Sequence, residues 1–288
     1  ARRIGKSFIV EEFAKKEYIS YLLIDFSIAS SIVFEFFKLY SDDLDTLLSN
    51  LELYYKKRLT PRKQRGTEAK SLIVFDEIQF CPQARSLIKY FVADGRYDYI
   101  ETGSLISIKK NVKNIMLPSE ERAIEMYPMD FEEFLWALGD EMMMPFIRKK
   151  FEAHQPMGEF HRRAMDYFRE YLIVGGMPQV VKKYVETKDF SKVEPIKRDI
   201  LSLYRNDIQK YADNQETKVV AIFDEIPGQL QKHEKKFRLS VFGESARMRD
   251  YSNAFFWLSD ASIINCCYNS TETSIIRKLN EQRTTLKC

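Results

Sequence analysis

Residues 71–80 read SLIVFDEIQF, and this stretch decides the expected fold. Four apolar residues stand in a row before Asp76, without the alternation that marks a half-exposed strand. Such a run predicts a strand buried on both faces, as in parallel sheets covered by helices. Asp76 and Glu77 follow at the carboxyl end of the strand, where α/β sheets bind their ligands. The stretch therefore predicts an α/β protein with an acidic site at one edge of its sheet.

The segments around this strand alternate between helical and extended patterns. The patterns predict helices at residues 8–16, 32–57 and 85–93, and strands at residues 21–26 and 97–100. Residues 60–70 (TPRKQRGTEAK) are polar and contain Pro61 and Gly66, which predicts an exposed loop. Strands that alternate with helices in this way predict a parallel sheet.

The second half of the chain has a different character. Amphipathic helices are predicted at residues 131–138, 151–174 and 193–211, with interruptions at Gly175, Gly176 and Pro178. Further on, the patterns predict a helix at 219–231, an extended segment at 236–242, a helix at 246–260 and an extended segment at 263–270. Helices followed by a short hairpin indicate a winged helix. The expected organisation is a P-loop core at residues 1–130, a helical region at 131–212 and a winged-helix-like part at 213–288.

The chain begins with ARRIGKS, which matches the phosphate-binding P-loop pattern G-x-x-x-x-G-K-[ST] except for its first glycine. That glycine, and a strand leading into it, would precede the first residue. Gly5 would let the backbone approach a phosphate, Lys6 would contact the β- and γ-phosphates, and Ser7 would bind magnesium. Gly-Lys-Ser also occurs at ordinary helix starts, so the triplet alone does not decide. The residues expected to bind the nucleotide are Ala1, Arg2, Arg3, Ile4, Gly5, Lys6, Ser7 and Phe8.

Asp76 and Glu77 form the acidic pair that a P-loop site requires. Asp76 would hold magnesium together with Ser7, and Glu77 would polarise the attacking water. The next predicted strand ends in YDYIETGS, where Thr102 and Ser104 would help to position that water. Thr-Gly-Ser is also ordinary turn chemistry. The prediction of a catalytic set of Glu77, Thr102 and Ser104 therefore depends on the order of the three motifs.

A second acidic segment, VVAIFDEIPG at residues 219–228, resembles the first. Its apolar residues fall at helical spacing, so we expect Asp224 and Glu225 on the solvated side of a helix, with Pro227 and Gly228 disrupting it. Arg122 is the nearest arginine after the Thr-Gly-Ser turn and is a candidate to contact the γ-phosphate.

The composition narrows the class of protein. The formal net charge of +3 is too small to indicate nucleic-acid binding by itself. The four cysteines form no CxxC pair and there are three histidines, which favours neither zinc nor a disulfide framework. No apolar run approaches the roughly 18 residues of a membrane span, and no signal peptide is visible. A cytoplasmic protein without a membrane partner is expected.

Several long stretches together resemble one family. They are ARRIGKSFIVEEFA, LIVFDEIQFCPQARSLIKYFVADGRYDYIETGS, MYPMDFEEFLWAL, YLIVGGMPQVV and LYRNDIQKYA. They are similar to the prokaryotic AAA+ superfamily ATPases that carry an uncharacterised C-terminal domain. The resemblance implies nucleotide binding by Lys6 and Ser7, and a Walker B pair at Asp76 and Glu77.

The resemblance also implies a helical linker and a winged-helix-like segment followed by a nuclease-like region. This sequence ends at LNEQRTTLKC, about where that region would begin, and contains no nuclease carboxylate–lysine motif. A nuclease role is therefore not carried over. The segment SEERAIEMYPMDFEEF also departs from the family, which weakens the assignment of Arg122 as an arginine finger.

The sequence leaves two functions open. The first is magnesium-dependent ATP binding and hydrolysis by an AAA+-type switch or motor that acts on an unknown partner and can oligomerise. The second is a winged-helix module that binds DNA or protein, with a structural or degenerate nucleotide site. The second rests on nearby basic residues: Lys235, Lys236, Arg238, Arg247 and Arg249.

Overall fold

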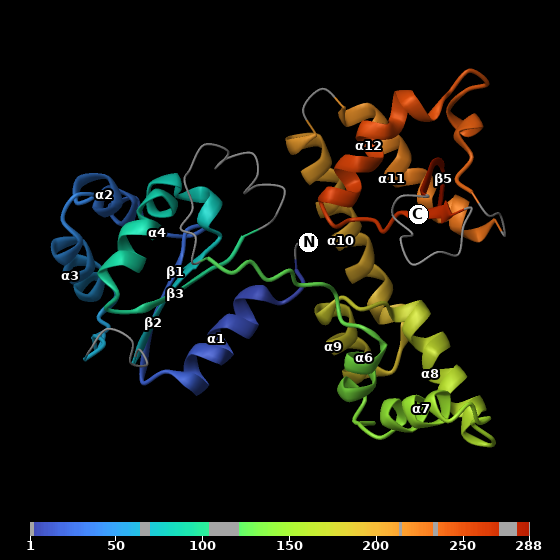
Figure 1. Cartoon of the computed structure of the whole chain (residues 1–288), viewed down its shortest axis with the longest axis horizontal. Coiled ribbons are helices and arrows are strands. Elements are labelled where there is room, and N and C mark those ends of the chain that lie inside the picture. The colour runs from blue at the N-terminus through green and yellow to red at the C-terminus, as the bar shows by residue number, and fades with distance from the viewer. Residues whose placement is uncertain are drawn as a thin grey trace. The chain divides into compact units, whose positions relative to one another are not determined.

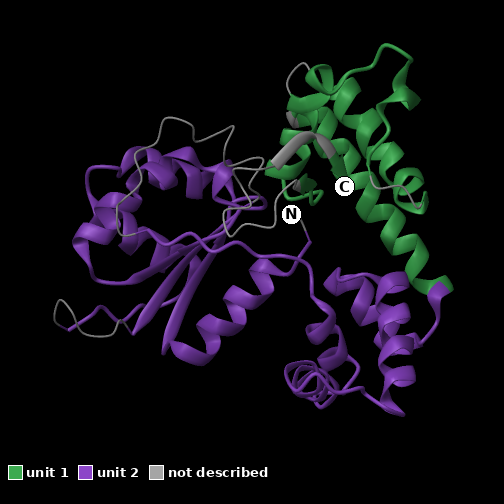
Figure 2. Ribbon diagram, turned by 45° about the vertical axis from the view of Figure 1, so that its right-hand side comes forward, with its two compact units in different colours: residues 1, 191–288 green, residues 2–190 purple. Residues whose placement is uncertain are grey.

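The structure, a computed structural model, describes residues 3–63, 70–103, 121–212, 215–232, 236–270 and 281–287. The chain divides into two compact units, residues 2–190 and residues 191–288 (Figure 2). The boundary falls at the beginning of helix α10 (Phe190–Tyr211). The three-part division at residues 130 and 212 stays a prediction.

The first unit contains a three-stranded parallel sheet in the order β1-β2-β3 (Figure 1). The strands are β1 (Ser20–Asp25), β2 (Ser71–Asp76) and β3 (Asp98–Glu101). β2 pairs with a neighbour on each side, and all six of its residues are buried. The predicted central strand, buried on both faces, is confirmed.

Helices cover both faces of this sheet. Helix α1 (Lys6–Glu17) packs through Ala14 on the face that carries Leu72 and Val74. The other face packs against α2 (Ser31–Leu39), α3 (Leu44–Tyr55) and α4 (Pro82–Asp94). Phe75 of β2 lies at the centre of that second layer, with ring centroids 5.9 Å from Phe37 and 5.7 Å from Phe91.

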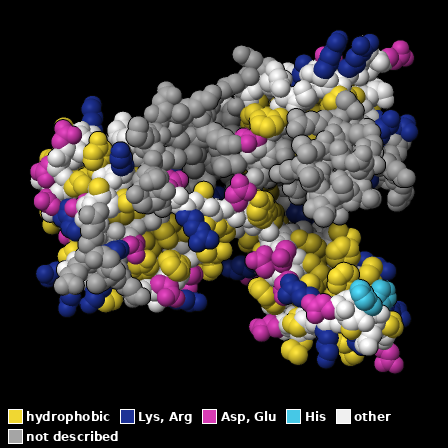
Figure 3. Space-filling model, in the orientation of Figure 1, with side chains coloured by type: hydrophobic (Ala, Val, Ile, Leu, Met, Phe, Trp, Pro, Cys, Tyr) yellow, Lys and Arg dark blue, Asp and Glu magenta, His cyan; other side chains and the backbone are white. Residues whose placement is uncertain are grey.

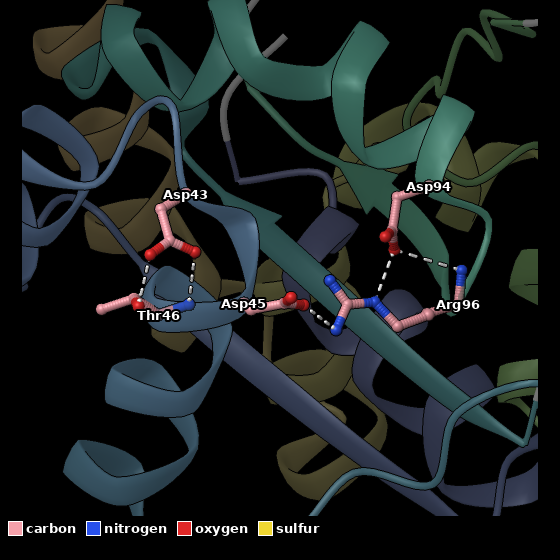
Figure 4. A network of polar contacts seen from close by, with 5 residues as sticks. All are labelled: Asp43, Asp45, Thr46, Asp94 and Arg96. Atoms are coloured by element: carbon pink, nitrogen blue, oxygen red, sulfur yellow. Dashed lines mark hydrogen bonds and ion pairs between the residues drawn. The ribbon is translucent and has the colours of Figure 1, made fainter.

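The helical pattern over residues 32–57 is divided into two helices by a cap. Asp43 accepts hydrogen bonds from the backbone N–H and the hydroxyl of Thr46, at 3.0 and 2.6 Å, and so begins α3 (Figure 4). These bonds also hold the pKa of Asp43 below its usual value. Arg96, just before β3, contacts Asp94 at 2.7 Å and Asp45 at 2.6 Å. The turn after α4 is thereby tied to the first turn of α3.

Four further helices lie in the described part of the first unit. They are α6 (Phe131–Ala137), α7 (Met143–Glu152), α8 (Phe160–Val174) and α9 (Pro178–Thr187). The prediction of one helix over residues 151–174 is wrong, because α7 ends at Glu152 and α8 begins at Phe160. Pro156 and Gly158, which has a φ of +61°, lie in the connection and explain the break.

The second unit continues from α10 with α11 (Glu216–Gln231), α12 (Met248–Asp260) and an antiparallel pair, β4 (Cys267–Ser270) and β5 (Glu281–Lys287). Val219 and Ile222 of α11 pack with Phe255 and Leu258 of α12 in its core. Helices followed by an antiparallel pair of strands agree with the expected pattern, and the winged-helix assignment stays a prediction.

Two expectations in this unit are wrong. Helix α11 runs through Pro227 to Gln231, so Pro227 does not end it; buried Gln229 continues the packed face beyond the proline. Residues 236–242 are not an extended segment. Phe237 bonds to Leu286 O of β5 at 2.7 Å, and the chain then turns into the 3-10 helix η2 (Leu239–Phe242). The expected helical position of Asp224 is confirmed; Asp224 is exposed and lies 2.8 Å from Arg205.

Throughout the described part of the chain, each helix is too short or too polar to span a bilayer.

A close backbone contact holds α9 in the first unit. The N–H of Met129 donates to the carbonyl of Gly176 at 2.7 Å, and the hydroxyl of Tyr171 donates to the carbonyl of Met129 at 2.9 Å. A Cβ atom at Gly176 would lie 2.0 Å from the carbonyl oxygen of Met129. The glycine is therefore required for the approach of these two backbone segments.

We expect the substitution Gly176→Ala to lower the free energy of unfolding by about 1–3 kcal/mol, because the backbone must move to admit the methyl group. The matched control is Gly228→Ala in α11, where a Cβ would lie 3.6 Å from a flexible Glu225 oxygen. This control should gain roughly 0.5–1 kcal/mol from helix propensity. Urea denaturation of both variants measures the difference, and equal stability of the two would contradict the argument.

Candidate functional site

The candidate site is an open pocket of about 350 Å³ at the beginning of α1. Residues from three distant parts of the chain line it. They are Arg3, Gly5, Lys6, Ser7 and Phe8 from the start of the chain, Glu77 after β2, and Pro178 and Gln179 from α9. The pocket therefore joins the glycine-lysine-serine segment to one carboxylate of the acidic pair.

The turn before α1 has the backbone form that suits an anion. Gly5 is the N-cap residue of α1 and has a left-handed conformation with φ of +89°. Glycine adopts this conformation without steric cost, and it has no side chain to cap the N–H groups of the first turn. Lys6 and Ser7 follow in that turn. A helix beginning with uncapped N–H groups beside a lysine is a favourable place for a phosphate.

Asp76, the last residue of β2, is 4% exposed and is held by a threonine. The hydroxyl of Thr102 donates to Oδ1 of Asp76. The same hydroxyl oxygen accepts from the backbone N–H of Glu77 at 3.4 Å. The backbone of Thr102 also bonds to Phe75 O at 2.9 Å and accepts from Ile78 N at 3.0 Å. Thr102 thus connects the end of β3 to the end of β2 through side chain and backbone together.

Glu77 has a different environment from Asp76 although it is the next residue. Its backbone is left-handed, with φ of +53° and ψ of +46°, which is unfavourable for a residue with a Cβ by roughly 1–2 kcal/mol. This turn leaves Asp76 buried under Thr102 and places Glu77 at the pocket. Strained residues of this kind cluster at functional sites. The Nε2 of Gln79 donates to Oε2 of Glu77.

The structure places the other predicted residues as follows. Ile4 is buried, at 3% exposed, whereas Phe8 is 68% exposed and lines the pocket. Asp76 and Thr102 lie at the ends of their strands and are not among the lining residues. Ala1, Arg2 and Ser104 lie outside the described residues. Arg122 is exposed and does not line the pocket.

The sequence interpretation missed the contribution of α9. The Nη1 of Arg3 donates to Oε1 of Gln179 at 2.9 Å, and a Cβ at Gly5 would lie 3.8 Å from Cγ of Pro178. The signal was present in the Gly-Gly-Met-Pro stretch, which was interpreted only as a helix interruption. A glycine pair before a proline at a helix start also marks a close backbone approach.

Two buried side chains, Arg85 and Cys81, lie close in sequence to the site residues but do not line the pocket. Arg85 of α4 is 6% exposed and pairs with Glu101, the residue before Thr102, and with Glu121 at 3.0 Å. Cys81 is buried, and burial raises the pKa of its thiol to about 11, so it stays protonated at neutral pH and is no nucleophile.

Metal binding by histidine and cysteine finds no support in the described residues. Among them, no group of three or more His, Cys, Asp or Glu side chains is placed to hold a metal. His154 and His161 are exposed. His233 lies outside the described residues.

The bond between Thr102 and Asp76 gives a prediction on stability. We expect Thr102→Val to lower the free energy of unfolding by about 1–3 kcal/mol, because a buried carboxylate loses its hydroxyl donor. Thr102→Ser keeps the donor and should lose less. Chemical denaturation at pH 7 measures both variants. If the valine variant is as stable as the serine variant, the hydroxyl does not support Asp76.

Two family models match parts of the chain. Residues 1–135 match the family model described as an AAA domain. Residues 165–288 match the model of a domain of unknown function, DUF8612. No curated protein and no solved structure matches the chain. The first match and the parallel sheet flanked by helices support an α/β domain of the AAA type that binds nucleotide, and the second leaves the C-terminal part without an assigned role.

Proposed function

We propose that this chain binds ATP with magnesium in the pocket before α1 and hydrolyses it as an AAA+-type ATPase. The observation that carries the proposal is the meeting of Lys6 and Ser7 with Glu77 around one pocket. Glu77 is distant in sequence from Lys6 and Ser7, and the three residues are the chemical types that phosphoryl transfer to water requires: a cation, a hydroxyl for the metal and a carboxylate for the water.

Two side chains supply the kind of oxygen donor that the proposal requires for magnesium. Ser7 offers an exposed hydroxyl, and Asp76 offers a carboxylate whose Oδ1 is oriented by the hydroxyl of Thr102. Oxygen ligands of this kind, one or two from the protein and the rest from phosphate and water, are what Mg²⁺ prefers. When bound, the ion would neutralise charge on the β- and γ-phosphate oxygens. The chain would hold it through Ser7 and Asp76.

The remaining roles follow from position. Lys6 and the N–H groups of the first turn of α1 would bind phosphate oxygens. Glu77 would orient the water and accept its proton. Thr102 would hold the Asp76 carboxylate and the Glu77 backbone in place through its hydroxyl. Ser104, as predicted from the sequence, would help to position the water. A change of nucleotide state at the pocket could reach α9 through Arg3 and Gln179, which would suit a nucleotide-driven switch.

Two variants test the proposal. We expect Lys6→Ala to weaken ATP binding roughly tenfold to a hundredfold, because a charge-assisted bond to phosphate is lost. Glu77→Gln should keep ATP binding but lower kcat by about 10²–10⁴-fold, because the acceptor of the water proton is lost. Isothermal titration calorimetry with ATP and Mg²⁺, together with phosphate release, measures the two effects.

Lys16→Ala is the matched control for Lys6→Ala, since Lys16 is an exposed lysine at the other end of α1. It should bind ATP like the wild type. Loss of binding in both lysine variants would mean a general charge effect. Absence of Mg-dependent ATP binding by the wild type would refute the proposal.

A second candidate function is binding of DNA by the second unit. Lys236, Arg238, Arg247 and Arg249 are all exposed, which favours it. Glu244 and Asp250 are exposed among them, and Figure 3 shows basic and acidic side chains interspersed over the visible described surface. Duplex DNA binding without nucleotide, weakening steeply with salt, would support this function. Fluorescence anisotropy at two salt concentrations measures this binding. A lack of salt-dependent binding would count against the DNA-binding function.

A further inference from the structure

Gln79 is a buried polar residue two positions after Glu77, in the 3-10 helix η1 (Ile78–Phe80). It is 2% exposed, although the pocket that Glu77 lines is open. Burial of an amide is unfavourable unless its polar atoms are bonded. The Nε2 of Gln79 donates to Oε2 of Glu77, so the buried amide is directed at the carboxylate.

The backbone around this pair is held firmly. The N–H of Phe80 bonds to Glu77 O at 3.1 Å, and the N–H of Cys81 bonds to Ile78 O at 3.0 Å. The N–H of Ile78 bonds to Thr102 O at 3.0 Å, which connects the turn to β3. With the left-handed backbone of Glu77 fixed in this way, rotation about its side-chain bonds is the freedom that remains. The amide of Gln79 restricts that rotation.

We propose that Gln79 is a positioning residue that holds the Glu77 carboxylate in the orientation needed to activate water. The inference rests on the proposed function. Oε2 of Glu77 receives the amide hydrogen, which leaves Oε1 to accept a proton from water. The water oxygen attacks the γ-phosphorus, the bond to the β,γ-bridging oxygen breaks, ADP leaves with that electron pair, and the proton passes to Oε1. Glu77 then returns the proton to solvent.

An amide suits this task better than a charged group. A second carboxylate at this position would repel Glu77, and a cation would pair with it and hold it away from the water. A neutral donor orients one oxygen without neutralising the other. The backbone of Glu77 stores strain that only a tightly packed turn can retain, so a buried donor is available there at fixed geometry.

The experiment is a double-mutant cycle of Gln79→Met with Glu77→Asp. Methionine keeps the volume and burial of glutamine but removes the donor. Aspartate keeps the carboxylate on a side chain that is one methylene shorter, so the carboxylate does not reach the Gln79 amide in the same way. Single-turnover hydrolysis of labelled ATP gives the rate in all four proteins, and titration with ATP and Mg²⁺ gives the Kd.

We expect Gln79→Met to lower the hydrolysis rate by about tenfold to a hundredfold in the wild-type background, because the carboxylate loses its alignment. The Kd for ATP should change less than about twofold, since Gln79 is not among the residues that line the pocket. In the Glu77→Asp background the same change should have little further effect. A residue that acts only on stability would instead lower the rate equally in both backgrounds.

The matched control is Gln229→Met in α11. Gln229 is also a buried glutamine, 6% exposed, and its Nε2 donates to a glutamate, Glu225, at 3.0 Å. It lies in the second unit and should leave hydrolysis unchanged. If Gln79→Met does not fold, Gln79→Leu replaces it, because leucine is an uncharged apolar side chain that fits inside the volume of glutamine and removes the same donor.

The outcomes separate the inference from the function on which it rests. The inference alone is overturned if the wild type hydrolyses ATP and Gln79→Met leaves the hydrolysis rate unchanged. It is also overturned if Gln79→Met lowers the rate equally in the wild-type and Glu77→Asp backgrounds. A wild type that does not hydrolyse ATP overturns the proposed function and the inference with it. A loss of rate confined to the Glu77 background, with Kd unchanged, supports both.

Discussion

The pairing of β2 on both of its edges is the constraint on which the rest of the first unit depends. Because β1 and β3 bond to it on either side and helices cover both faces, all six residues of the strand are buried. Its last residue, Asp76, is then a buried carboxylate that needs a donor, which Thr102 supplies from the neighbouring strand. The same pairing brings the ends of β2 and β3 together beside Glu77, which lines the pocket.

The turn after β2 separates two adjacent carboxylates into two roles. Asp76 remains under the sheet edge, whereas the left-handed backbone of Glu77 brings it to the pocket. Neighbouring residues on a strand normally point to opposite faces, so a single strand cannot deliver both carboxylates to one ligand. The strained turn changes the direction of the chain so that Glu77 lines the pocket, and the hydrogen bonds to Thr102 and within η1 stabilise it. Gln79 then bonds to the Glu77 carboxylate.

Much of the fold can be predicted from local sequence patterns, and the predictions that were wrong have clear physical causes. Helical periodicity places α1, α4, α6, α11 and α12 correctly to within a few residues, and the apolar run places β2. The predicted helix over residues 151–174 joins the end of α7 to α8, although Pro156 and Gly158 lie in the connection between them. Pro227 fails as a breaker because packing of α11 continues beyond it. Tertiary burial overrides propensity at such places.

The sequence by itself determined the chemical parts of the site: a glycine-lysine-serine segment at a helix start, and a buried strand that ends in two carboxylates. These are local features, readable from residue type and spacing. Only the tertiary structure decided that Pro178 and Gln179 belong to the same pocket, since Arg3 and Gln179 are 176 positions apart. Just before α9, Gly176 approaches the backbone of Met129. Both contacts are properties of packing, which periodicity along one segment does not record.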